Sequence, residues 1–173
     1  MNMTHYMELL AVNQPWNLII FMAIPVGLAE TVVITELYIL FTRRLDGWVR
    51  RINRWAGIAV GLYFLGIIIY LLTTAVLPIT AAGEWRTVLD VIAVGAYLLG
   101  GIPLLLVALQ DLGLIYRHLT PEQKLRHHAT YVAAFLILGH VAMIFGMTDP
   151  GLLGYQASAE HAMPMEQGGH TGH

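Results

Sequence analysis

The stretch WNLIIFMAIPVGLAETVVITELYILFT, residues 16–42, decides the fold. Its 27 residues contain no Lys, Arg or His. A helix of this length rises about 1.5 Å per residue and can cross a hydrocarbon core of roughly 30 Å. It nevertheless carries two carboxylates, Glu30 near its midpoint and Glu36. A charged side chain at the bilayer centre costs about 2.5–3.5 kcal/mol, so these two acids need an explanation.

The rest of the chain has the composition of an integral membrane protein. Of its 173 residues, 57% are hydrophobic and 12% are charged, and the mean hydropathy is +0.66. Three further apolar stretches predict helices at about 55–77, 88–116 and 127–147. We therefore predict an all-α, antiparallel four-helix bundle over residues 16–147, with a short lead at 1–15 and a flexible tail at 148–173.

The basic residues indicate the orientation of this bundle. Of the nine Lys and Arg residues, eight lie between the first and second or between the third and fourth predicted helices, and only Arg86 lies on the other side. Short cytoplasmic loops are rich in Lys and Arg. The pattern therefore predicts that both termini lie outside, in the periplasm if the membrane is a bacterial inner membrane.

Glu30 and His140 are the two ionisable residues predicted to lie deepest in the membrane. Counted inward from Thr42 and from His127, the expected cytoplasmic ends of their helices, Glu30 is 12 residues deep and His140 is 13. They could bind an ion, carry a proton or ligate a cofactor. Alternatively, a neutral Glu30 could simply hydrogen-bond to His140 or to a threonine and lock two helices together. Glu36 could pair with the nearby arginines or form the inner step of a proton path through Glu30.

Thioether and imidazole side chains are plentiful on the predicted outer side. Met22 and Met147 are each 20 residues from the cytoplasmic ends, and His140, Met143 and Met147 share one face of their helix. The tail adds five more such side chains: His161, Met163, Met165, His170 and His173. With no cysteine in the chain, this donor set favours copper, especially Cu(I). The alternatives are ordinary packing for the helical methionines and a plain disordered tail.

Two short segments resemble a known group of proteins. At THYM (4–7) with NQPWN (13–17), and at AETVVITELYILFTRR (29–44), the chain resembles bacterial four-span membrane proteins sometimes labelled permeases. The resemblance implies a bacterial inner membrane location. It brings no catalytic residues, and the sequence contains no nucleophile elbow, phosphate loop or HExxH motif, so an enzyme is not expected.

These observations lead to one leading hypothesis and two alternatives. The leading hypothesis is a copper-binding or copper-permeating protein, with an intramembrane Glu30–His140 site fed by periplasmic Met and His ligands. The first alternative is a membrane subunit of a redox complex that binds haem b or quinone or conducts protons. The second is a structural accessory subunit. The expected partners are the lipid bilayer, a metal ion, and a larger membrane complex or further copies of the chain, but not nucleic acid.

Overall fold

The computed structural model describes residues 4, 7–8 and 11–153, and all regular structure in this part of the chain is helical. Four helical spans are long and apolar enough to cross a membrane, which confirms the predicted all-α membrane protein with four spans. The first span consists of α2 (Trp16–Leu18), the π-helical turn η1 (Ile19–Ala23) and α3 (Ile24–Thr42). The second consists of α4 (Trp48–Leu71), the π-helical turn η2 (Leu72–Val76) and α5 (Leu77–Ala82). The third is α6 (Val88–Asp111), and the fourth is α7 (Pro121–Met147), followed by the short 3₁₀ helix η3 (Pro150–Leu153).

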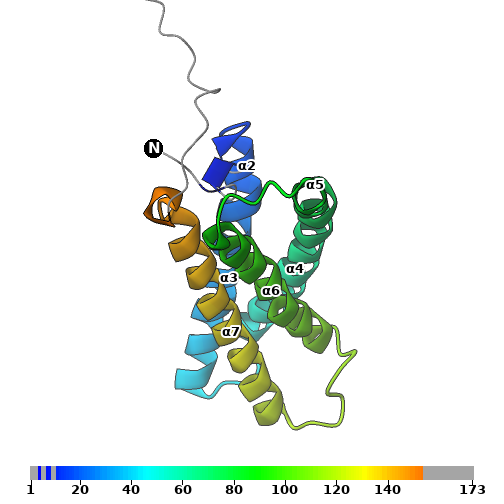
Figure 1. Cartoon of the computed structure of the whole chain (residues 1–173). Coiled ribbons are helices and arrows are strands. Elements are labelled where there is room, and N and C mark those ends of the chain that lie inside the picture. The colour runs from blue at the N-terminus through cyan, green and yellow to red at the C-terminus, as the bar shows by residue number, and fades with distance from the viewer. Residues whose placement is uncertain (1–3, 5–6, 9–10, 154–173) are drawn as a thin grey trace, which may run out of the picture.

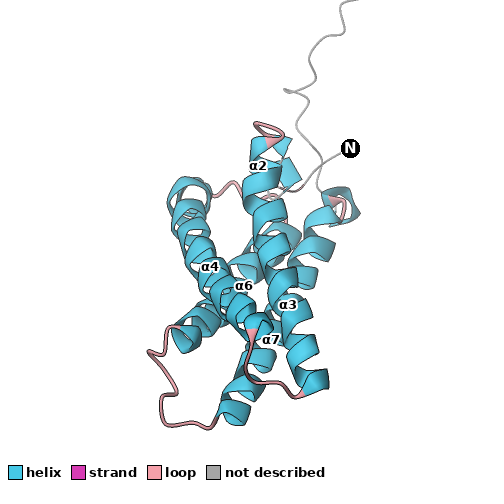
Figure 2. Ribbon diagram, turned by 180° about the vertical axis from the view of Figure 1, so that it is seen from behind, coloured by secondary structure: helices cyan, strands magenta, loops and turns pink. Residues whose placement is uncertain are grey.

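Successive spans run up and down, and short loops join them at alternate ends of the bundle (Figure 1). Helix α6 packs against both α4 and α7, and α3 packs against α4. By contrast, α3 touches α7 through only a few residues, and the same arrangement is seen from behind (Figure 2). Loops 43–47 and 112–120 lie at one end, which we call the basic end because its loops and helix termini carry eight of the nine Lys and Arg residues.

The structure corrects four predicted helix boundaries, two of them in the second span. The second span begins at Trp48 and not at residue 55, because arginines are good helix formers and extend from its first turns toward the polar end. It also continues past Pro78 to Ala82, since the π-helical turn η2 precedes the proline and accommodates its missing N–H.

Capping motifs set the end of the third span and the start of the fourth. Helix α6 stops at Asp111, not residue 116, because Gly113 adopts φ +75° and the N–H of Leu114 bonds to the carbonyl of Leu109 at 2.9 Å. Helix α7 begins at Pro121, not residue 127, because Thr120 and Gln123 form a reciprocal capping box.

Pro25 shapes the first span beside Glu30. Pro25 has no N–H, and the π-helical turn η1 ends two residues before it. The carbonyls of Ile20 and Phe21, about one helical turn earlier, therefore lack their usual backbone donor. Tyr63 from α4 donates to the carbonyl of Ile20 at 3.1 Å, and Tyr97 from α6 donates to that of Phe21 at 2.8 Å. The proline therefore creates acceptors that tie the first span to two neighbours.

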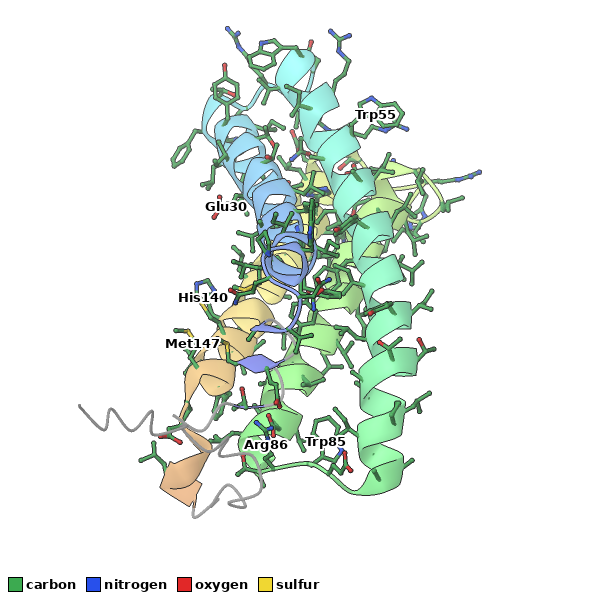
Figure 3. All side chains as sticks on the ribbon, turned by 90° about the horizontal axis from the view of Figure 1, so that it is seen from above. Glu30, Trp55, Trp85, Arg86, His140 and Met147 are labelled. Carbon is green, nitrogen blue, oxygen red and sulfur yellow. The ribbon has the colours of Figure 1, made fainter. Side chains whose placement is uncertain are left out.

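Tryptophans mark both ends of the spans. Trp48 and Trp55 are exposed on α4 near the basic end, whereas Trp16 is exposed at the other end. Trp55 and Trp85 lie toward opposite ends of the molecule (Figure 3). Tryptophan is enriched at membrane–water interfaces, so this placement is typical of a membrane-spanning bundle.

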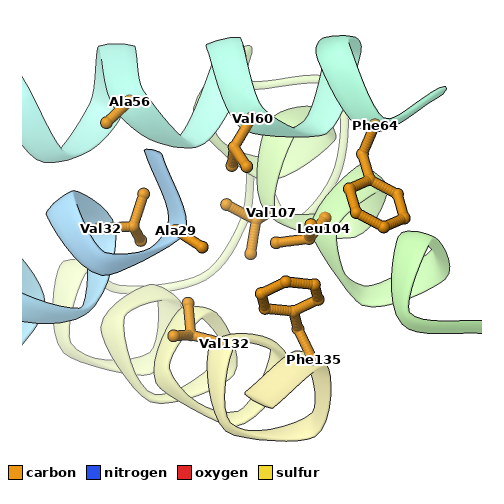
Figure 4. Close-up of a cluster of buried hydrophobic side chains, with 9 residues drawn as sticks. All are labelled: Ala29, Val32, Ala56, Val60, Phe64, Leu104, Val107, Val132 and Phe135. Carbon is orange, nitrogen blue, oxygen red and sulfur yellow. The ribbon is translucent and has the colours of Figure 1, made fainter. Parts of the chain in front are cut away.

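The apolar core lies where all four spans meet (Figure 4). It is built around nine buried residues, two each from α3, α6 and α7 and three from α4: Ala29, Val32, Ala56, Val60, Phe64, Leu104, Val107, Val132 and Phe135. Helices α4 and α6 approach closely at Gly57, where an added Cβ would lie 2.4 Å from Oδ2 of Asp111. A neighbouring Gly61 completes a GxxxG pattern on α4, which allows close helix packing in membranes.

Candidate functional site

A cleft between α3 and α7, at the place where these helices barely touch, encloses a cavity of about 200 Å³. Most of its lining is apolar or aromatic. Four lining side chains carry a thioether, a carboxylate or an imidazole: Met22, Glu30, His140 and Met143. We call this the α3/α7 cleft. Figure 3 shows Glu30 and His140 along one side of the molecule, on α3 and α7 respectively. Both the carboxylate and the imidazole therefore line this cleft. Their predicted match in depth does not hold, because α7 begins at Pro121 and His140 is 19 residues from that end, whereas Glu30 is 12 residues from Thr42.

The carboxylate and the imidazole of the cleft are available to a ligand. Glu30 is exposed, and its carboxylate makes no hydrogen bond or ion pair within the described part of the chain. His140 uses Nδ1 in a 2.6 Å contact with the carbonyl oxygen of Leu136. A carbonyl can only accept, so Nδ1 carries the hydrogen, and in the neutral ring Nε2 keeps its lone pair. A metal-binding histidine is commonly held by such a second hydrogen bond.

The methionines divide into two groups. Met143 is 43% exposed and lines the cleft with Met22. Met147 is 68% exposed, lies at the end of α7 and is not part of the lining. The sequence predicted that Met22 and Met147 lie at one depth, because residues were counted from His127. Since α7 begins at Pro121, the methionine that matches Met22 is Met143, one turn nearer the bilayer centre.

The five tail ligands, His161, Met163, Met165, His170 and His173, lie outside the described residues. Within residues 4, 7–8 and 11–153, no group of three or more His, Asp and Glu side chains could hold a metal ion. A metal in the α3/α7 cleft would therefore need the thioethers of Met22 and Met143 besides His140 and Glu30. Thioether donors favour soft ions such as Cu(I).

A second polar site lies inside the bundle toward the basic end. His128 on α7 is fully buried between two carboxylates. Its Nε2 lies 3.0 Å from Oδ2 of Asp111 on α6, and its Nδ1 forms an ion-pair contact with Oε2 of Glu36 on α3, although this contact is not aligned as a hydrogen bond. Both ring nitrogens face carboxylate oxygens, so both carry hydrogen and the ring is an imidazolium.

Helix α4 completes this site. Arg50 lies 3.6 Å from Oδ1 of Asp111 and donates to Oδ1 of Asn53 at 2.7 Å. Asn53 in turn donates to Oε2 of Glu36 at 3.2 Å. These five residues, which we call the buried charge cluster, come from all four spans. Two negative and two positive side chains make the cluster neutral, and Oε1 of Glu36 is a buried carboxylate oxygen with no hydrogen-bond partner in the described structure.

The cluster corrects two sequence-based expectations. The sequence predicted a fourth helix from residue 127, but α7 begins at Pro121, so His128 lies in its second turn and is buried. There it faces Asp111, which also pairs with Arg50. Glu36 pairs with His128 and Asn53, whereas the expected partners Arg43 and Arg44 do not reach it. The capping motif TPEQ at 120–123 was the available sequence signal.

The whole arrangement falls within one family model, which matches residues 1–162. The chain belongs to the family of unknown function DUF6803. No curated protein and no solved structure matches it. Both the α3/α7 cleft and the buried charge cluster of this DUF6803 member lie inside the matched range, whereas four of the five tail ligands, Met163, Met165, His170 and His173, lie beyond it.

Proposed function

We propose that this protein handles copper in a bacterial inner membrane, binding Cu(I) in the α3/α7 cleft for storage, delivery or permeation. One observation carries the proposal. An unpaired carboxylate, an imidazole with one nitrogen free and two thioethers line the same cleft. Leaving Glu30 unpaired at mid-membrane depth is unfavourable, so a bound cation gives it a stabilising partner.

The chemistry of the donors suits a monovalent soft ion. The thioethers of Met22 and Met143 and Nε2 of His140 are soft or intermediate ligands that favour Cu(I). Glu30 supplies one negative charge against the single positive charge of the ion. When the ion leaves, a proton can neutralise Glu30 in its place. Glu36 lies six residues further along α3, about 9 Å away, and we propose it as the next proton-accepting group.

The orientation belongs to the same proposal. Loops 43–47 and 112–120 share one end of the bundle, and this basic end faces the cytoplasm if the positive-inside rule applies. Both termini then lie in the periplasm, where the Met and His residues of the tail capture the ion. A second copy of the chain or a larger membrane complex is a further candidate to cover the open side of the α3/α7 cleft.

Cu(I) binding by the purified full-length protein tests the proposal. Titration against a competing Cu(I) chelator, under reducing anaerobic conditions, should show one ion bound in wild type. His140→Ala, Glu30→Gln and Met143→Leu should each weaken binding about tenfold or more. Met147→Leu is the matched control and should bind as wild type, because Met147 does not line the cleft. Equal or negligible copper in wild type and all variants would refute the proposal.

The first alternative is a redox-complex subunit that conducts protons or binds haem or quinone, and the buried charge cluster favours its proton-conducting form. Its imidazolium lies between two carboxylates, one of which has an unpartnered oxygen. Haem b would require another axial ligand, since both nitrogens of His128 already face carboxylates and His140 is alone in the cleft. A visible spectrum discriminates, because a Soret band indicates haem.

The second alternative is a structural accessory subunit. Co-purification with a larger complex, with no bound ligand and no loss of function in Glu30→Gln, would favour it.

A further inference from the structure

A separate cavity of about 380 Å³ lies at the basic end, between the last turn of α3 and the first turns of α7. It is distinct from the α3/α7 cleft and shares no lining residue with it. Three charged residues line it, Arg43 at the end of α3 and Glu122 and Arg126 at the start of α7. The remaining lining is aliphatic and includes Leu40 and Leu125.

The three charges of this cavity are free. Within the described residues, none of Arg43, Glu122 and Arg126 uses its side chain in a hydrogen bond or an ion pair. Two other arginines at the basic end are engaged: Arg50 pairs with Asp111, and Arg54 donates to the carbonyl of Asp111 at 2.8 Å. The cavity therefore presents two guanidinium groups and one carboxylate above an aliphatic wall.

The depth of the cavity matches the headgroup level of a bilayer. Phe41 and Trp48 flank this end of α3 and α4 and are among the most exposed apolar side chains, at 85% and 67%. Aromatic side chains concentrate at this level of the membrane. Basic pockets between transmembrane helices on the cytoplasmic side bind lipid headgroups. A ligand here is expected to have a charged head and an apolar chain.

We propose that this cavity binds a glycerophospholipid whose headgroup carries a primary ammonium, the phosphatidylethanolamine class. Arg43 and Arg126 hold the phosphate, since guanidinium groups recognise phosphate oxygens with paired N–H donors. Glu122 accepts hydrogen bonds from the ammonium. An acyl chain then packs against Leu40 and Leu125. The proposal does not depend on copper binding.

The pairing of individual groups, and not net charge, selects this lipid over the alternatives. The two guanidinium groups share one phosphate, and the carboxylate meets one ammonium. Phosphatidylglycerol offers the phosphate but leaves Glu122 without a cation. Phosphatidylcholine carries a quaternary ammonium that has no N–H to donate. Glu122 therefore sets the headgroup preference, whereas the two arginines set the affinity for phospholipid.

Lipid binding by the delipidated full-length protein in detergent tests this site. Native mass spectrometry with added phosphatidylethanolamine, phosphatidylglycerol or phosphatidylcholine should show about tenfold tighter binding of the first. Arg43→Gln and Arg126→Gln should each weaken binding of all three lipids about tenfold. Glu122→Gln should abolish the preference for phosphatidylethanolamine while keeping phosphatidylglycerol binding. Arg51→Gln is the matched control, because Arg51 is an exposed arginine outside the cavity.

Several outcomes would overturn the proposal. Equal binding of the three lipids by wild type would do so, as would a preference for phosphatidylglycerol. Unchanged binding in both Arg43→Gln and Arg126→Gln would also do so. Competition by inorganic phosphate as effective as by the lipid would assign the cavity to a soluble anion. Matching circular dichroism spectra of the variants and wild type establish that the fold is retained.

Discussion

Replacing His128 with asparagine should be among the most destabilising single substitutions in this protein. The substitution removes the positive charge between Glu36 and Asp111 and leaves both carboxylates buried. Only Arg50 then remains to neutralise them, at 3.6 Å from Asp111 and with 27% of its side chain exposed. Breaking a buried ion pair by removing one partner costs about 3–5 kcal/mol. At about 1.4 kcal/mol per tenfold, the unfolding equilibrium constant should rise by a factor of 100 or more.

The free energy of unfolding can be measured by titrating the protein in mixed micelles with a denaturing detergent. His118→Asn is the matched control, since His118 is exposed in the loop at 112–120. It should change the free energy by less than about 0.5 kcal/mol. A loss below about 1 kcal/mol in His128→Asn would refute the reasoning, because a buried imidazolium between two carboxylates cannot be removed so easily.

A double variant separates charge from packing. Adding Glu36→Gln to His128→Asn removes one carboxylate and returns the cluster to neutrality, with Arg50 facing Asp111. The double variant should therefore be more stable than His128→Asn alone, although each substitution by itself destabilises. Adding Glu30→Gln instead should give no such rescue, because Glu30 lies in the α3/α7 cleft and does not contact the cluster. Simple additivity in both double variants would show that the loss comes from packing and not from uncompensated charge.

Two further predictions concern helix packing. Gly57→Ala should destabilise the protein by about 1–3 kcal/mol, since the new Cβ would lie 2.4 Å from Oδ2 of Asp111; Gly66→Ala, where nothing lies within 4 Å, should be neutral or slightly stabilising in the same unfolding titration. Tyr97→Phe should cost about 1 kcal/mol by losing its hydrogen bond to the carbonyl of Phe21. In a Pro25→Ala background this cost should fall, because the restored N–H competes for that carbonyl; an equal cost in both backgrounds would contradict the assigned role of the proline.

Much of the fold could be predicted because membrane insertion depends on local composition. The four spans follow from their length and hydropathy, and the first was placed at residues 16–42 as observed. The errors lie at helix ends, where short motifs compete with composition. The arginines at 50, 51 and 54 indicated a loop, yet they occupy the first turns of α4. The capping box at Thr120 and the terminating Gly113 were present in the sequence but were outweighed by the apolar pattern.

The sequence by itself determined that this is an all-α protein of four membrane spans, since the length and hydropathy of each span are local properties of the chain. Only the tertiary structure decided which polar groups meet. Glu36 and His128 are 92 residues apart in the chain, and their contact depends on how α3 and α7 are rotated and where each begins. The same packing closes these helices around the buried charge cluster at one level and leaves them apart at Glu30 and His140. Hydropathy along the chain locates each membrane span. Which side chains contact one another depends on how the helices rotate and pack against each other, and the sequence of a single helix does not specify that.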